Sequence, residues 1–279
     1  MRKRKGWRQT VRSVLFWTCL VLILIPVLFP ILYAFLTSLK SARLAQSPVP
    51  YLIFEPTLEH YYKLFFTNDF GRFFTNSIVV SLASVALALV VGVPAAYAFS
   101  RIQFPFKRFL LLWILTTRIL PPIGTAIPFY VFFMKAGLID SQISLVIVYL
   151  TFNVSFVIWV MMTFFDQVPK ALDEAGRIDG CSITGAFLRV VLPTTAPGLA
   201  SVAIFVFLFS WNNFFYPLVL THSEAVTVPL ALTTFLGFYI IDWSSITAGI
   251  CLLILPQLIF TFVLRDYLVK GLGQGAVVG

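Results

Sequence analysis

The sequence is poor in charged residues. Only 11% of its 279 residues are Asp, Glu, Lys or Arg, whereas about 25% is usual for a soluble domain. The mean hydropathy is +0.95. Several apolar runs reach the roughly 20 residues that a helix needs to cross a bilayer core of about 30 Å. A soluble domain is therefore excluded, and the composition predicts an all-α polytopic membrane protein.

Cysteine and histidine are also scarce. Cys19, Cys181 and Cys251 have no metal-like spacing, and His60 and His222 lie far apart without a matching set of ligands. We therefore expect neither a disulfide framework nor a metal site. The sequence also lacks a Ser/His/Asp set and a pair of acidic metal ligands, which argues against a membrane-embedded enzyme.

The net charge of +9 does not indicate a face that binds nucleic acid. Lys and Arg cluster beside apolar runs, which is the pattern of membrane orientation. The apolar runs themselves contain no Asp or Glu. A stand-alone secondary transporter is expected to show inverted repeats and often intramembrane acids, so this class is disfavoured as well.

What the sequence does contain is six apolar runs within one membrane domain, residues 1–279. The first run follows a basic segment, and a cleavable signal peptide is the alternative interpretation for it. A signal peptide would have a shorter apolar core and a small-x-small cleavage site, for which "TSLKSARLAQS" is a poor candidate, so we expect an uncleaved anchor. The six predicted transmembrane helices are about 14–36, 74–99, 109–133, 145–165, 196–220 and 246–264.

Lys and Arg are concentrated in alternate segments between these spans. They occur in the amino-terminal segment, after the second span, in the loop 166–195 and in the tail 265–279. The other loops hold fewer, although they are longer in total. Because basic residues stay on the cytoplasmic side, both termini and the loop 166–195 are predicted to be cytoplasmic. The first outer loop, 37–73, is rich in aromatic residues and is predicted to form short interfacial helices.

The loop between the fourth and fifth spans, "DEAGRIDGCSITGAFLRVVLPTTAP", is polar and rich in turn residues. A first short helix is predicted from Pro169, with acids early in the helix and Gly180 as its end. Ser182 is expected to cap a second short helix that stops at Pro193. Its apolar side would hold Ile183, Phe187, Val190 and Val191. The loop could be a docking element or an ordinary connector lying on the lipid headgroups.

The spacing within this loop resembles the EAA motif of binding-protein-dependent ABC importer permeases. Glu174-Ala175-Gly176 is followed at the family's spacing by Gly180, then by Val190, Leu192 and Pro193. Gly176 replaces the second alanine, at a cost of about 1 kcal/mol in a helix interior, and could allow close approach of a partner. The resemblance implies a cytoplasmic coupling helix that docks into an ATPase subunit. The residues implied in coupling are Glu174, Ala175, Gly176, Asp179, Gly180, Leu192 and Pro193.

Other segments are similar to the carbohydrate, or maltose-type, branch of these permeases. They are "AAYAFSRIQFPFKR", "LPPIGTAIPFY", "WNNFFYPLVL" and the ending "YLVKGLGQGAVVG". The branch implies a sugar or sugar derivative as substrate, and glycerol phosphate, polyamines or another small solute are the alternative. Family members end in a glycine-containing tail that can reach the ATPase pair, and read alone this terminus is flexible. Here the tail would contain Gly271, Gly273 and Gly275.

The resemblance also implies partners. These are a second permease subunit of different sequence, two cytoplasmic ATPase subunits and an extracytoplasmic solute-binding protein, all around a bacterial inner membrane. The sequence has no Gly-x-x-x-x-Gly-Lys-Ser/Thr, so the chain cannot itself hydrolyse ATP. We therefore expect no enzyme activity and no cofactor in this chain, with ATP and Mg bound by the ATPase.

Polar residues inside the predicted spans are candidates for the solute pathway. Arg118 lies deep in the third span, where an ionisable group usually faces a cavity. The alternative is a structural arginine that snorkels or binds the carbonyls freed by Pro121 and Pro122. The remaining candidates could bind a sugar or serve packing between helices; they are Asn153, Ser155, Trp211, Asn212 and Asn213.

Overall fold

The computed structural model describes the backbone of residues 2–237 and 241–275, and the side chains of residues 10–237 and 241–265. In this part of the chain every regular element is a helix, and one isolated β-bridge joins Leu236 to Ile241. The predicted all-α fold is confirmed. The chain forms two compact units, Met1–Asn68 with Thr234–Leu253 and Asp69–Thr233 with Ile254–Gly279.

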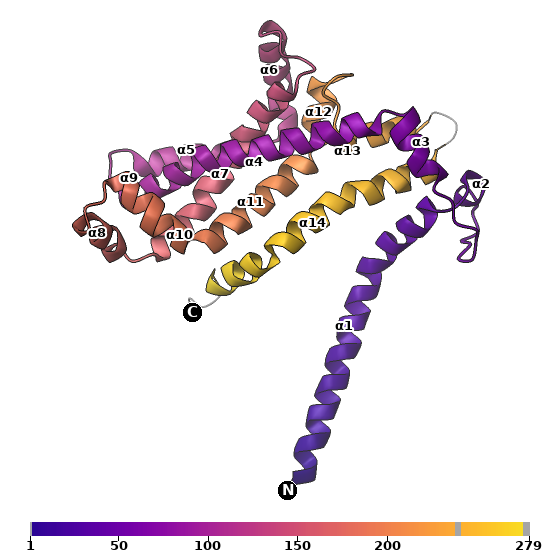
Figure 1. Cartoon of the computed structure of the whole chain (residues 1–279), viewed down its shortest axis with the longest axis horizontal. Coiled ribbons are helices and arrows are strands. Elements are labelled where there is room, and N and C mark those ends of the chain that lie inside the picture. The colour runs from indigo at the N-terminus through magenta and orange to yellow at the C-terminus, as the bar shows by residue number, and fades with distance from the viewer. Residues whose placement is uncertain (1, 238–240, 276–279) are drawn as a thin grey trace. The chain divides into compact units, whose positions relative to one another are not determined.

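The first unit is built around a long amino-terminal helix (Figure 1). Within Thr10–Ser38 the most apolar stretch has no residue buried inside the chain, and Thr37 and Ser38 at the end of the helix are buried, so the helix leaves most of its apolar surface to lipid or to another protein. The expectation of short helices in the first outer loop is confirmed. His60 has a structural role there, because its Nε2 lies 2.9 Å from the backbone oxygen of Lys40. The helices of this unit are α1 (Arg2–Ser38), α2 (Ala42–Ala45), α3 (Glu59–Thr67) and the first turns of α14 (Trp243–Gly275).

The second unit is centred on three long helices, α4 (Phe70–Arg101), α7 (Gln142–Gln167) and α11 (Ala196–Trp211). Each packs against the other two. A Cβ atom on Gly92 of α4 would lie 2.7 Å from side-chain atoms of Val157 in α7, so only glycine allows this approach. Small residues at helix interfaces are typical of membrane proteins, because close van der Waals packing drives association in lipid.

The predicted span 109–133 is interrupted. It consists of α5 (Lys107–Ile119) and α6 (Pro122–Lys135), which are bent by 93° relative to one another. The break coincides with Pro121 and Pro122, which lack the N–H that a continuous helix needs and restrict the residue before them. Non-helical backbone inside a membrane is tolerated where it lines a cavity or is buried in protein. The break between α5 and α6 is therefore expected to line a cavity or to be buried in protein.

The predicted span 196–220 likewise consists of two helices, α11 and α12 (Phe215–Leu220). Two short elements follow, α13 (Val228–Ala231) and η2 (Leu232–Phe235). Among the described residues, four helices are long and apolar enough to cross a membrane, and the number reaches six if each of two bent pairs counts as one span. One of those pairs combines the helix 183–194 with α11, so the predicted count of six stays a prediction.

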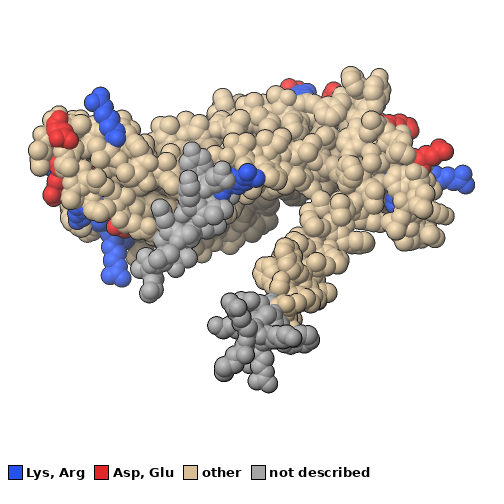
Figure 2. Space-filling model, turned by 60° about the horizontal axis from the view of Figure 1, so that its bottom comes forward, with Lys and Arg blue, Asp and Glu red and all other residues tan. Residues whose placement is uncertain are grey.

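The final helix extends further than the sequence suggested. α14 continues through Gly271 and Gly273 to Gly275, and no proline follows Pro256 to interrupt it. The glycines expected in a flexible tail therefore belong to a helix, and residues 276–279 lie outside the described part. Figure 2 shows charged side chains at the end that carries α8, whereas the surface along the neighbouring helices is largely uncharged.

Asp140 organises the turn before α7. It has a left-handed backbone with φ of 59°. Its carboxylate accepts hydrogen bonds from the backbone N–H groups of Glu224 at 2.9 Å and Ala225 at 3.0 Å, and from the Ser223 hydroxyl at 2.8 Å. Burial acts to raise the pKa of Asp140, but these donors outweigh it and hold that pKa well below its usual range. The segment 222–225 is thereby fastened to the start of α7.

Candidate functional site

The first candidate region is the loop 166–195, which we call the coupling loop. Its first helix is α8 (Ala171–Ile178), and its second runs through α9 (Ile183–Ala186), the π-helix η1 (Phe187–Val191) and α10 (Leu192–Thr194). The predicted cap is confirmed, because the Ser182 Oγ accepts the Gly185 N–H at 3.1 Å. The predicted turn is confirmed as well: Gly180 has φ of +87°, a conformation that residues with a Cβ rarely adopt.

Pro193 does not stop the second helix as predicted. The helix continues to Thr194, and the chain then bends by 80° into α11. A proline in a helix clashes with the carbonyl four residues earlier, which here belongs to Arg189, and Arg189 lies in the wider π turn of η1, a geometry that can relieve such a clash. The helical path therefore survives the proline and ends at Thr194.

The coupling loop has a buried side and an exposed tip. Gly176 is buried, and a Cβ there would lie 3.2 Å from Val190 Cγ2 and 3.3 Å from Ala186 Cβ. The close approach that this glycine allows is thus between the two helices of the loop itself. At the tip, Ile178 is 86% exposed and Ile183 is 62% exposed. Ile183 therefore does not belong to the buried side with Phe187 and Val191, because it is the first residue of the second helix and lies at the turn.

The base of the coupling loop is held by a cluster that the sequence did not reveal. The guanidinium of Arg101, the last residue of α4, donates from Nε to Asp173 Oδ2 at 2.9 Å. It also donates to the backbone oxygens of Phe165 at 3.0 Å and Val168 at 2.9 Å. The Tyr97 hydroxyl donates to the other oxygen of Asp173. The available signal was an arginine in the last turn of a span, a position that favours bonds to helix-end carbonyls.

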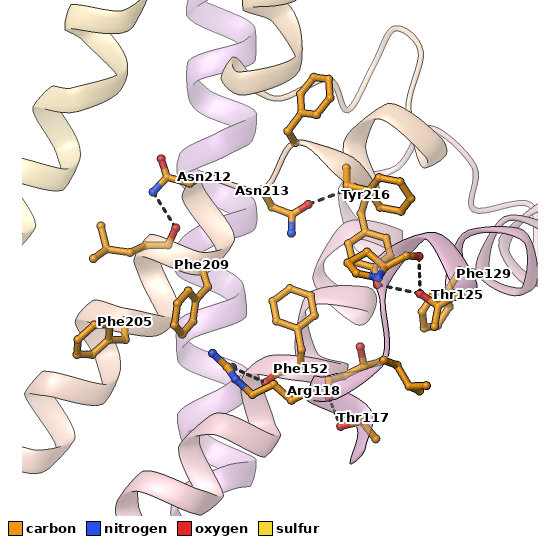
Figure 3. Close-up of a pocket in the computed structure, with 16 residues that line it drawn as sticks. Thr117, Arg118, Thr125, Phe129, Phe152, Phe205, Phe209, Asn212, Asn213 and Tyr216 are labelled. Atoms are coloured by element: carbon orange, nitrogen blue, oxygen red, sulfur yellow. Dashed lines mark hydrogen bonds between the residues drawn. The ribbon is translucent and has the colours of Figure 1, made fainter. Parts of the chain in front are cut away.

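The second candidate region is a cavity of about 930 Å³ beside the break between α5 and α6. This volume is within the range of small-molecule sites. Figure 3 shows Arg118 and Phe209 at one side of the cavity and Thr125, Phe129 and Tyr216 at the other. The walls are mainly aromatic, with a few polar groups. The aromatic residues are Phe129, Phe152, Phe205, Phe209, Phe214, Phe215 and Tyr216, and the polar ones are Thr117, Arg118, Thr125, Thr151, Asn212 and Asn213.

Arg118 is stacked between two phenyl rings. Its guanidinium carbon lies 4.7 Å from the ring centre of Phe156 and 4.6 Å from that of Phe209. One nitrogen donates to the backbone oxygen of Phe152 in α7 at 3.3 Å. This carbonyl is not one of those freed by Pro121 and Pro122, which was the structural alternative. Two aromatic faces stabilise the cation and hold its plane, so its hydrogen-bonding edges are fixed in direction.

The polar candidates fall into two groups. Asn212 and Asn213 line the cavity with Arg118. The other three are buried and are not among its lining residues. Asn153 Nδ2 donates to Ser210 Oγ at 2.9 Å, the Ser155 hydroxyl lies 2.6 Å from that of Thr117, and Trp211 packs on Phe74 and Phe207. Apart from the contact of Trp211 with Phe207 in the same helix, these contacts join helices, which is the packing role stated as the alternative.

Comparison with known proteins identifies the family. The model of the binding-protein-dependent transport system inner membrane component matches residues 88–274. The chain belongs to this family. Both the coupling loop and the cavity lie inside the matched range, so this permease carries its two candidate regions in the part that defines the family.

Individual relatives agree with the assignment. The permease is 36% identical to the probable ABC transporter permease protein y4oR of Sinorhizobium fredii, over 96% of this chain and 97% of the relative. It is 32% identical to the trehalose transport system permease protein SugB of Mycobacterium tuberculosis, over 96% and 99%. Its fold is similar, with a TM-score of 0.77 and 23% identity, to a bacterial ABC transporter involved in the import of alginate, over 92% and 96%.

Proposed function

We propose that this chain is the permease subunit of an ATP-driven importer for a sugar or sugar derivative, and that it forms half of the translocation pathway. The observation that carries the proposal is the coupling loop, with an exposed apolar tip on a fixed base. Large apolar side chains exposed on a turn between two short helices favour a protein partner. In a permease that lacks a nucleotide-binding motif, this partner is the ATPase, which binds ATP and Mg.

The tip of the coupling loop is the proposed ATPase contact. Ile178 and Ile183 would enter an apolar part of the ATPase cleft, and the exposed Glu174 would meet a basic group there. This arrangement requires the α8 end of the second unit to be cytoplasmic, with both termini, as the distribution of Lys and Arg predicts. The tail with Gly271, Gly273 and Gly275 would reach the same ATPase pair.

The cavity is the proposed part of the solute pathway. A sugar presents apolar ring faces and polar hydroxyl edges, and the aromatic walls with Arg118, Asn212 and Asn213 match both. A water-accessible cavity also explains how a cation is tolerated at this depth. The similarity to a trehalose permease supports the sugar class.

The complete importer would contain a second permease subunit, two ATPase subunits and an extracytoplasmic solute-binding protein. Closure of the ATPase pair on ATP would move the coupling loop and turn the cavity from one side of the membrane to the other. Coupling free energies are reciprocal, so docking of the loaded binding protein must favour closure of the ATPases. No catalytic step takes place in this chain.

Replacement of Gly180 tests the proposal. Gly180→Asp, or deletion of residues 173–180, is expected to abolish uptake in whole cells while the permease still inserts into the membrane, because the altered turn no longer fits the ATPase. Gly137→Asp is a matched control: Gly137 also has positive φ, +66°, and a Cβ added to either glycine would meet no other atom within 4 Å.

The control variant should keep uptake, since Gly137 lies outside the coupling loop. Affinity purification of the tagged wild-type chain should recover an ATPase and a second permease in fixed ratio, and Gly180→Asp should lose the ATPase. Normal uptake by Gly180→Asp, or a folded wild-type chain that purifies alone, would contradict the proposed function.

A further inference from the structure

We propose that Arg101 is a positioning residue that joins the coupling loop to α4 and α7, so that α8 moves with these two helices as one body. The inference rests on the proposed function, because it concerns how motion at the ATPase reaches the cavity. It assigns the transmission to one guanidinium and its partner Asp173, neither of which touches the cavity.

The first argument is convergence. Arg101 ends α4, its bonds to the oxygens of Phe165 and Val168 hold the end of α7, and its ion pair holds Asp173 in the first turn of α8. The covalent link between α7 and α8 is only residues 168–170. Without the guanidinium, Asp173 keeps the bond from the Tyr97 hydroxyl of α4 but loses its connection through Arg101 to the end of α7, so α8 can pivot about this short link. With it, rotation of α8 must break at least one bond to α4 or α7.

The second argument is burial. The side chains of Arg101 and Asp173 are only 10% and 14% exposed. Both carboxylate oxygens are used, Oδ2 by Arg101 and Oδ1 by the Tyr97 hydroxyl of α4. An ion pair screened from water resists separation far more than an exposed pair does. A displacement of α8 is therefore expected to move α4 and α7 before the ion pair separates.

The third argument is that α4 and α7, the two helices that Arg101 connects to α8, are firmly held against each other. α4 and α7 approach closely at Gly92, and the Ser100 hydroxyl donates to Asp166 at the end of α7. In contrast, the second helix of the coupling loop follows the Gly180 turn and meets this cluster through ring contacts, such as Phe187 against Tyr97 at 4.6 Å. Apolar contacts can slide, whereas directed hydrogen bonds cannot. The first half of the loop is thus the rigid half.

The test measures whether ATP at the ATPase changes the cavity. A single cysteine replaces Thr151, an exposed residue of α7 that lines the cavity, in a chain whose Cys19, Cys181 and Cys251 are serine. The complete importer is treated with a membrane-impermeant maleimide, with and without a non-hydrolysable ATP analogue. The wild-type background should change its labelling rate by about tenfold, as for a site that moves between minor and major states.

Arg101→Gln is expected to abolish this ATP dependence while the complex still binds nucleotide and assembles. The matched control is Arg108→Gln, an exposed arginine beyond the same end of α4, which should behave as wild type. If Arg101→Gln fails to assemble, Asp173→Asn keeps the side-chain shape and carries the same expectation. In both, a purely structural role would lower the amount of complex but leave the ATP dependence intact.

Two outcomes separate this inference from the proposed function. A wild-type background whose labelling at position 151 ignores ATP would contradict the cavity as a pathway, and with it the proposed function. An ATP response that survives both Arg101→Gln and Asp173→Asn would overturn the proposed role of Arg101 and Asp173, while the importer function stands. Loss of the response in these variants and its retention in Arg108→Gln would support that role.

Discussion

The two ends of α7 are held by single ionised side chains in opposite ways. At the end of the helix, Arg101 pairs with the side chain of Asp173 and with two carbonyl oxygens. At the start, about 39 Å away for 26 residues, Asp140 accepts mainly from the backbone N–H groups of 222–225. The end of the helix depends in part on one specific side chain, that of Asp173, whereas the start depends mainly on backbone groups that almost any residue supplies.

This difference predicts how each end of α7 responds to amino-acid substitution. The contact of Arg101 with Asp173 depends on both side chains and is screened from water, so substitution of either residue is expected to be strongly destabilising. The Asp140 side chain is itself only 8% exposed, but most of its donors lie on the exposed residues 222–224, where water can replace a lost acceptor at modest cost. The segment 222–225 can therefore vary in sequence while its position stays fixed, provided that it contains no proline.

The largest effect is expected from Arg101→Leu. The substitution leaves Asp173 as a buried charge without a counterion, which costs about 3–5 kcal/mol for a buried pair. The midpoint of thermal unfolding of the purified importer should fall sharply. Arg108→Leu is the control and should change the midpoint little, because Arg108 is exposed. Equal midpoints for the two variants would show that the ion pair contributes nothing.

A smaller effect is expected from Asp140→Ala. It removes the acceptor of several backbone N–H groups, most of them on the exposed residues 222–224, so we expect a loss of about 1–2 kcal/mol, local to the turn. Limited proteolysis should cut within 222–227 faster than in wild type. Asp69→Ala is a matched control, because Asp69 is exposed and also has positive φ, 51°. Cleavage that is equally fast in both variants would argue that backbone strain, not the carboxylate, holds the segment.

The smallest effect is expected from mild acid. Because the pKa of Asp140 is lowered by folding, its contribution is complete above the ordinary value of about 3.9 and is lost only as pH falls toward the lowered value. Proteolysis of 222–227 should therefore be unchanged from pH 7 to about pH 5. His222, whose Nε2 lies 3.3 Å from the carboxylate, is the other ionisable group beside it.

Asp140→Asn is the control for the acid experiment. Its amide does not titrate, so any pH response that remains does not come from this carboxylate. Release of the segment in wild type already between pH 6 and pH 5, and not in Asp140→Asn, would contradict the lowered pKa.

The local structure of the coupling loop was largely predictable from the sequence. Ser182 caps a helix and Gly180 turns the chain because these preferences are set by the residue and its immediate neighbours. The behaviour at Pro193 was not predictable, since the π turn that accommodates it depends on how η1 packs. The partners of Arg101 were also missed, because Phe165, Val168 and Asp173 lie at least 64 positions further along the chain.

The sequence by itself determined that this is a helical membrane protein of the permease family, with a two-helix loop before its fifth predicted span. Hydropathy, charge distribution and short motifs are local properties, and a linear sequence displays them directly. Only the tertiary structure decided which polar residues face the cavity and which serve packing: it brings Arg118 and Asn212 together and buries Asn153 between helices. The reason is that lining a cavity depends on helix rotation and on the 93° bend after α5, which are set by packing across the bundle.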